Sequence, residues 1–224
     1  GSQTEKAVYL EERGKELPMK KSFNLFLCIL CCLFSLSACS QPEKSVEEHV
    51  NMAQEQLGKP LGEAYQALGL PGNPEDAAEV FYLHAEDCVK VLGKQMDVAI
   101  VHLGKDEEDK KLTDEKTNSV EYLALLGGDY AYPLKLYRAL REAYGEPEPV
   151  TGAQSFSQAT EVSLEAMKQS ERCANQWKKE DYVIVISFNV GASAAGGSSI
   201  SLEISLPVEL LGLPTISPDG KIIG

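Results

Sequence analysis

Cys39 is the residue whose surroundings most clearly indicate chemistry. It follows two lysines, Lys20 and Lys21, and an apolar run from Leu25 to Phe34 that is ten residues long. A run of that length is typical of a secretory signal and falls well short of the roughly 20 residues that a membrane-spanning helix needs. The residues just before the cysteine are small, and a cysteine thiolate is a strong nucleophile. We therefore expect this segment to direct export and to be removed.

The residues Leu36-Ser37-Ala38-Cys39 resemble the lipobox of bacterial lipoproteins, in which a leucine and two small residues precede a lipidated cysteine. The resemblance implies a thioether-linked diacylglycerol on Cys39, which becomes the new N-terminus. Each buried methylene contributes about 0.8 kcal/mol, so two or three acyl chains anchor durably. The implied location is the bacterial cell envelope, outside the cytoplasm, and Ser40 favours the outer membrane if the host has one. The alternative is an ordinary signal peptide that is cut elsewhere and leaves Cys39 unmodified.

The signal divides the chain into segments of different kinds. Residues 1–18 precede a plausible start at Met19, and we interpret them as an upstream extension or a cloning artefact. The expected order is then a signal peptide at 19–38, a tether at 39–44, a first α/β unit at 45–128, a second at 129–210 and a tail at 211–224. The 186 residues that follow the cut are enough for one large domain or two small ones.

The body after the signal is strongly acidic, with 16 basic and 30 acidic side chains and a formal charge of −14. A field of that sign repels phosphate backbones and anionic lipid headgroups. Nucleic-acid binding is therefore excluded as an expected function. The alternative is that the acidic residues serve only to keep the protein soluble.

Cys88 and Cys173 are the only other cysteines outside the signal. Two thiols in an oxidising compartment suggest a possible disulfide, and closing the 85-residue separation would stabilise the fold by roughly 4 kcal/mol. The alternative is that both are free thiols in equivalent core positions of two similar units, since free cysteine is among the most buried residue types. The sequence leaves both possibilities open.

Four landmarks recur in the same order and predict a tandem repeat. The landmarks are a Pro-Leu pair with a Tyr-x-Ala-Leu motif, a cysteine segment, a strand that begins with aspartate, and a second strand. In the first unit they lie, in this order, at residues 60–68, 86–92, 97–103 and 119–126. In the second unit they lie at residues 133–140, 171–177, 181–188 and 199–206. We expect each unit to read helix, helix, strand, loop, strand. The resulting fold class is α+β, an antiparallel sheet with helices packed on one face.

Local patterns specify several elements of these units. Ser45 and Glu48 form a capping box before an amphipathic helix that ends at Gly58. A second helix opens near Pro133 and stops at Gly145. The segment 158–179 is expected to form one long helix, with Ala166, Ser170, Cys173 and Trp177 on one face. Residues 76–92 are ambiguous, because a helix and a strand both suit them.

The element order resembles the tandem helix-helix-sheet modules of the secreted beta-lactamase inhibitor protein and of small outer-membrane assembly lipoproteins. The likeness covers most of residues 44–207 and includes no diagnostic motif. It therefore implies the architecture and assigns no functional residue.

The remaining residue clusters do not complete a catalytic or metal site. Residues 191–196 are similar to a nucleophile elbow, but no histidine follows His102 in the chain. The three histidines lack the partners of a metal site, and the acidic run 106–109 lacks the central glycine of a calcium loop. We expect no metal, no cofactor and no catalytic residue.

The leading functional hypothesis is therefore a non-catalytic, membrane-anchored module that binds a protein or envelope component. The loops 104–118 and 191–198 would carry its contacts, or are tolerated insertions. A second hypothesis is an extracytoplasmic hydrolase with carboxylates such as Asp97 or Asp181 between the two units. A third is a carrier of lipid or another small ligand, which requires a large apolar cavity.

Overall fold

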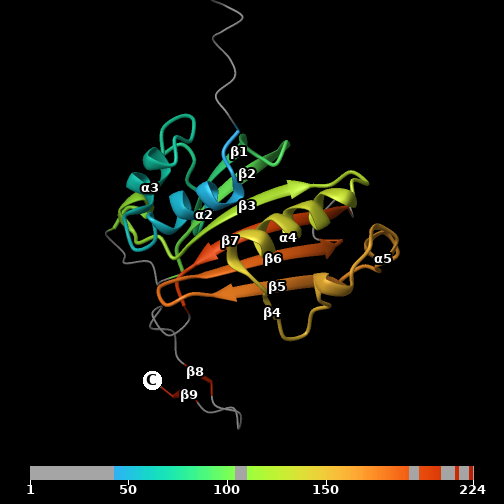
Figure 1. Cartoon of the computed structure of the whole chain (residues 1–224). Helices are drawn as coiled ribbons and strands as arrows, with labels where there is room; N and C mark the ends of the chain where they lie inside the picture. Colours follow the sequence, from blue (N-terminus) through green and yellow to red (C-terminus); the bar gives the residue numbers. More distant parts are fainter. Residues whose placement is uncertain (1–42, 104–109, 192–196, 208–214, 217–221, 224) are drawn as a thin grey trace, which may run out of the picture. The chain divides into compact units, whose positions relative to one another are not determined.

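The computed structural model describes residues 43–103, 110–191, 197–207, 215–216 and 222–223. The described residues from 43 onward belong to one compact unit. It contains a seven-stranded antiparallel sheet and a few helices, so the α+β fold class is confirmed (Figure 1). The segment 1–42, with the expected signal peptide and Cys39, lies outside the described residues. Among the described residues, no helix is both long enough and apolar enough to cross a bilayer.

The first half of the fold has two helices and three strands. Helix α2 spans Val46–Gln54, helix α3 spans Leu61–Ala67, and strands β1, β2 and β3 span Tyr82–Val91, Lys94–Val101 and Ser119–Leu125. The predicted capping box is confirmed, because the Glu48 amide donates to Ser45 Oγ at 3.1 Å and the Ser45 amide donates to the Glu48 carboxylate at 2.6 Å. A 3₁₀ turn, η1, spans Leu112–Asp114.

The second half has one long helix and mostly strands. Helix α4 spans Ala131–Tyr144, and strands β5, β6 and β7 span Arg172–Lys178, Val183–Val190 and Ser198–Ser205. The short elements are β4 at Glu148–Pro149, the 3₁₀ turn η2 at Phe156–Gln158, α5 at Glu161–Glu165, β8 at Thr215–Ile216 and β9 at Ile222–Ile223. Gly145, with φ of 83°, ends α4 as predicted, because this backbone conformation disfavours residues with a Cβ.

The expected helix over 158–179 is wrong. Ser170 has a φ of 71°, which no α-helix accommodates, and the next residues form β5. In β5 the core side chains Cys173, Asn175 and Trp177 recur at a period of two, Arg172 and Lys178 at the ends are exposed, and Ala174, also buried, lies on the opposite face. The apolar pair Cys173 and Trp177, four residues apart, fits both periods, and pairing with β6 selects the strand.

The ambiguous segment 76–92 is a strand as well. Residues 82–91 form β1, which continues into β2 through a tight hairpin. Leu92 and Gly93 form its turn with φ values of 48° and 86°, the positive values that a two-residue hairpin turn requires. Cys88 therefore lies on a strand, as Cys173 does, and the helix expected around Cys173 is wrong.

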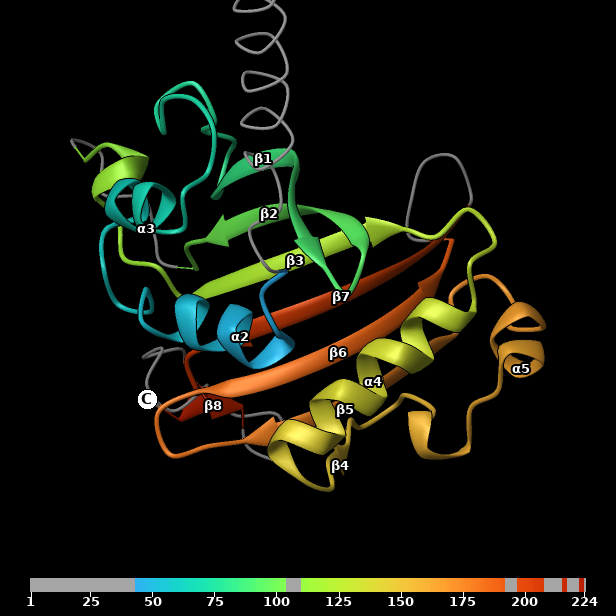
Figure 2. The same cartoon turned by 45° about the horizontal axis from the view of Figure 1, so that its top comes forward.

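The strands lie side by side in the order β1-β2-β3-β7-β6-β5-β4, and neighbouring strands pair antiparallel. β3 and β7, the last strands that the two halves contribute to this sheet, are paired at its centre. Figure 2 shows α4 lying across β5 and β6, with α2 beside it near β7. The seven-stranded sheet therefore crosses the boundary that we expected at residue 128.

One hydrophobic core fills the space between the sheet and these helices. Its centre consists of side chains that are 0% exposed, contributed by both halves of the sheet and by α4: Val98, Ile100, Val120, Leu136, Leu140, Ile184, Ile186, Phe188, Ile200, Leu202 and Ile204. Polar side chains reinforce it at two places. Trp177 Nε1 donates to the Gly145 carbonyl at 2.8 Å, and the Tyr132 hydroxyl donates to the Val91 carbonyl at 2.9 Å.

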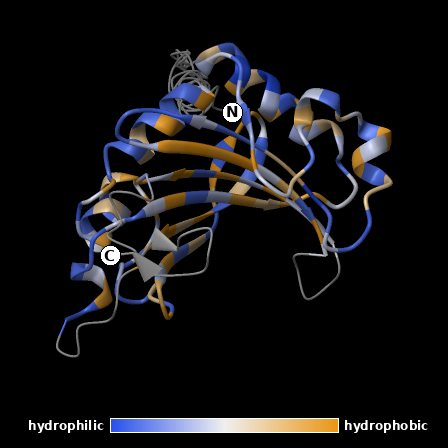
Figure 3. Cartoon of the chain, turned by 90° about the horizontal axis from the view of Figure 1, so that it is seen from below, coloured by the Kyte–Doolittle hydropathy of each residue, from blue (hydrophilic) through white to orange (hydrophobic). Residues whose placement is uncertain are grey.

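The opposite face of the sheet carries no described helix, and we call it the open face. Its residues alternate with the core residues along each strand, as the pleat requires. Figure 3 shows the sheet arched, with the helices on the outer side of the arch and the open face on the inner side. The seven strands thus form a curved platform, and no described helix covers its inner side.

Candidate functional site

The centre of the open face holds two carboxylates directly opposite each other. Glu121 of β3 pairs in register with Glu203 of β7, and cross-strand partners point to the same face, with Cβ atoms about 5 Å apart. Their core-facing neighbours, Tyr122 and Leu202, are buried under the helices. Both glutamates are half-buried. Two like charges therefore meet at the junction between the two halves of the sheet.

Burial raises the pKa of both carboxyl groups above the ordinary glutamate value. For Glu121 the raising effect of desolvation is opposed by a hydrogen bond from Ser201. For Glu203 desolvation also comes first, the charge of Glu121 raises the pKa further, and Ser205 and Arg172 oppose the shift. The pair therefore holds protons more strongly than an exposed carboxylate does.

Mostly small side chains surround the two carboxylates, and the bulky exception is Leu123, which follows Glu121 on the same face of β3. The registers place Ala99 beside Glu121 and Val185 beside Glu203, and serines occupy most of the adjacent positions on the open face. These are Ser119, Ser187, Ser199, Ser201 and Ser205. The carboxylates therefore lie among mostly small groups, and their direct pairing leaves no bulky side chain between them.

Arg172 is the cation whose charge lowers the pKa of Glu203. Its Nη2 donates to Ser187 Oγ at 2.7 Å, so the guanidinium is directed along the open face from β5 toward β6. Among the described residues, no ion pair joins Arg172 or any other cation to Glu121 or Glu203. The two carboxylates are therefore only partly compensated.

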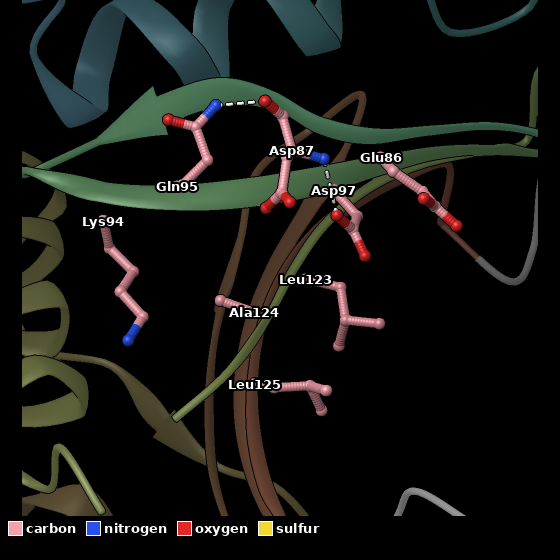
Figure 4. A pocket seen from close by; sticks show the side chains of 8 residues that line it. All are labelled: Glu86, Asp87, Lys94, Gln95, Asp97, Leu123, Ala124 and Leu125. Carbon is pink, nitrogen blue, oxygen red and sulfur yellow. Dashed lines mark hydrogen bonds between the residues drawn. The ribbon is translucent and has the colours of Figure 1, made fainter. Parts of the chain in front are cut away.

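A hollow of about 430 Å³ lies on the β1 side of the open face (Figure 4). It forms where β1 bulges between Ala85 and Val89, and Asp87 at the bulge has a φ of 44°. The Asp87 amide donates to Asp97 Oδ1 at 2.7 Å, and Gln95 Nε2 donates to the Asp87 carbonyl. Asp97 Oδ2 also lies 3.7 Å from His84 Nε2. Asp97 therefore holds the bulge in place.

The two aspartates proposed from the sequence are not brought together. Asp97 is on β2, and Asp181 is exposed in the turn between β5 and β6, with β3 and β7 between the two strands. The sequence reasoning missed Glu121 and Glu203, which are 82 positions apart and carry no local motif. The only available signal was their alternation with apolar residues on the two predicted strands.

Cys88 and Cys173 are free thiols in this structure. They lie on β1 and β5, five strand spacings apart, or about 24 Å, whereas a disulfide needs Cα atoms within about 7 Å. Cys173 is buried, and burial raises the pKa of its thiol to about 12. The structure therefore contains two separate free thiols, one half-buried at Cys88 and one buried at Cys173.

The histidines do not form a metal site. His49 is buried, its Nε2 lies 3.1 Å from the Lys90 carbonyl, and its ring contacts Tyr122 edge-on. His102 Nδ1 lies 3.2 Å from the Lys116 carbonyl, and its Nε2 is 3.5 Å from buried Glu115. The part of the chain that the structure describes contains no group of three or more potential metal ligands.

The expected binding loops fall largely outside the described residues, because 104–109 and 192–196 are not described. No protein-family model, curated protein or solved structure matches this chain. The fold and the open face define it as an α+β protein with an open antiparallel sheet. The central carboxylate pair is the candidate functional site.

Replacing Glu203 by glutamine is expected to stabilise the fold at neutral pH. A raised carboxyl pKa favours folding below the ordinary glutamate pKa, and that contribution is lost as the pH rises through the folded-state value. Relief of the like-charge contact should raise the unfolding free energy by about 0.5 to 1 kcal/mol at about pH 8 and by little at about pH 4. Urea denaturation at both pH values measures this difference, with exposed Glu142→Gln on α4 as the matched control. Equal effects of the two substitutions would contradict the assigned environment.

Proposed function

We propose that this protein is a membrane-anchored, extracytoplasmic lipoprotein that binds another protein or an envelope component through the open face of its sheet. The single observation that carries the docking part is the sheet face that no described helix covers, with a partly compensated carboxylate pair at its centre. The pattern around Cys39 supports the lipid anchor. Both parts describe a binding module without catalytic chemistry.

The proposed anchor would place the folded body close to the membrane. Only six peptide units separate Cys39 from Ser45, the residue that caps α2. Even fully extended, such a connection spans no more than about 20 Å. A partner would therefore meet the open face near the bilayer surface.

The size of the open face is compatible with a specific protein interface. From β1 to β5 it is about 24 Å wide, and the strands are about 25 Å long, which together give about 600 Å². A standard interface buries about 800 Å² on each partner. Tyr82 and Leu125, which are 37% and 61% exposed, add apolar contact area to this face. Exposed aromatic and aliphatic side chains are frequent anchors of interfaces.

We also propose that the two halves derive from a duplicated unit. The support is the strand order, in which β1-β2-β3 is followed by β7-β6-β5, so that corresponding strands lie symmetrically about the β3–β7 pair. Cys88 and Cys173 occupy corresponding strands. The halves differ in their other elements, since only the second has β4 and η2 between its two helices, and α5 is shorter than α3.

A hydrolase remains the second candidate, and the observation that favours it is again Glu121 with Glu203. Two carboxyl groups on adjacent strands with raised pKa values can act as a general acid and a general base. Catalysis also requires a pocket that encloses the substrate. The hollow described above is centred on the β1 bulge, so the geometry favours binding. A lipid carrier has less support, because charged and polar residues contribute most of the lining of that hollow.

Site-specific photocrosslinking in living cells tests the docking proposal. A photoreactive phenylalanine analogue is placed at Val185 or Leu125 on the open face, and at Glu142 on α4 as the control for the helical side. We expect discrete crosslinked products from the open-face positions and none from position 142. Products of equal yield from both sides, or products only from position 142, would overturn the open face as the docking surface.

A further inference from the structure

This inference rests on the proposed docking function and names the chemistry of its central contact. We propose that Glu121 and Glu203 together bind the guanidinium group of an arginine side chain that a protein partner inserts into the centre of the open face. The partner is therefore a protein with an exposed arginine in its docking surface.

The first step of the argument is the position of the two carboxylates. They face each other across the central strand pair, and each strand is flanked by further strands on its other side. A sheet tolerates such a pair only at a cost, because like charges directly opposite each other destabilise it. A cation placed between them removes this repulsion, so the free protein carries a strain that a bound cation relieves.

The second step is the absence of an internal partner. Among the described residues, no lysine, arginine or histidine lies within ion-pair distance of either carboxylate. Arg172 donates to Ser187 and lowers the pKa of Glu203 only against the stronger effect of burial. The negative charge is therefore available to a group from outside.

The third step is the shape of the surroundings. Ala99 and Val185 flank the pair along its row, and Ser201 and Ser205 lie beside it. Small groups at these positions leave room for a flat group to lie between the carboxylates. A guanidinium is planar and presents several N–H donors in a fork, so one cation can donate to both carboxylates at once. An ammonium group lacks this fork.

The fourth step is charge complementarity over a larger area. Asp97 lies on the same face two strands from Glu203, and the body after the signal has a formal charge of −14. The basic residues that the registers place on this face, His84 and Lys90 on β1 and Arg172 and Lys178 on β5, lie on strands away from its centre. A partner with a positive charge facing the centre is therefore attracted and oriented.

A titration with N-acetyl-arginine amide, followed by amide chemical shifts in two-dimensional NMR, tests this inference on the mature protein. N-acetyl-citrulline amide serves as the uncharged isostere. We expect saturable shifts centred on residues 121, 201 and 203 with the arginine compound and none with citrulline. The double variant E121Q/E203Q should weaken binding at least about tenfold, and E142Q/E165Q, which changes the net charge equally on exposed helical positions, should retain it.

The affinity for N-acetyl-arginine amide should also rise between about pH 5 and about pH 8. The pair retains a proton at the lower pH, and the arginine must displace this proton in order to bind. Equal binding of arginine and citrulline, or equal weakening in the two double variants, would overturn the inference. If photocrosslinking locates a partner on the open face and the arginine compound fails to bind, the inference fails and the docking function stands. If dimerisation that depends on Glu121 and Glu203 is observed in sedimentation experiments, the occupant is a second copy of this chain, and the separate partner is overturned.

Discussion

Replacing Cys39 by serine is expected to move the protein from the membrane fraction to the soluble fraction of cells that express the full chain. The reason is chemical, because a hydroxyl at neutral pH lacks the nucleophilicity of a thiolate and forms no thioether with a lipid. Without two or three acyl chains, the acidic body has no durable hold on a bilayer. Cell fractionation with immunodetection, together with incorporation of labelled palmitate, measures the change.

Cys32→Ser is the matched control for this experiment, since it removes a thiol from the apolar part of the same segment. We expect this variant to remain lipidated and membrane-bound. If the Cys39→Ser protein stays in the membrane after an alkaline wash, the attachment has another origin. The proposed placement outside the cytoplasm would then lose its chemical basis, whatever the open face binds.

Phe188→Ala is expected to produce the largest loss of stability. Phe188 is 0% exposed on β6, its ring meets that of Tyr130 edge-on at 6.3 Å, and it pairs with Cys173 and Ile200 across the sheet. Truncating a buried phenylalanine to alanine removes contact area and leaves a cavity, which costs about 3 to 5 kcal/mol. This is a large share of the 5 to 15 kcal/mol that stabilises a typical domain.

Chemical denaturation followed by tryptophan fluorescence measures this loss, because Trp177 lies in the same core. Leu125→Ala is the control on the same sheet, since Leu125 is 61% exposed on the open face. Its effect should stay within about 0.5 kcal/mol. A loss below about 1 kcal/mol for Phe188→Ala would mean that β6 does not pack under α4 in the way the structure describes.

The helices with explicit capping or stop signals were the most predictable part of the fold. The Ser45–Glu48 capping box and the Gly145 stop are interactions within a few residues, so the sequence contains both partners. The strands β3, β6 and β7 were predictable for a related reason, because their apolar residues alternate at the period of a pleated strand.

β5 was not predictable in this way. Its buried residues include Asn175, whose side chain accepts from the Phe156 amide at 2.8 Å and donates to the Glu148 carbonyl at 3.2 Å. A buried asparagine breaks the apolar alternation that identifies a strand. Its partners are 19 and 27 positions away in the sequence, so the reason for its burial becomes visible only when the segments are in place.

The candidate site depends even more on long-range pairing. Glu121 and Glu203 each look like an ordinary outward-facing residue of an amphipathic strand, and nothing nearby in the chain distinguishes them. They become a pair because β3 and β7 join the two halves of the sheet in one particular register. A shift of one residue in that register would turn every side chain of one strand to the other face.

The residues themselves thus account for the acidic character, the α+β class, the capped helices and the expected export with a lipid at Cys39, because each of these follows from composition or from contacts between near neighbours. The strand order, the identity of β5, the separation of the two cysteines and the meeting of the two glutamates required the folded chain. They arise from hydrogen bonds between segments far apart in the sequence, and many alternative pairings have similar local patterns. Packing of one continuous core selects among them.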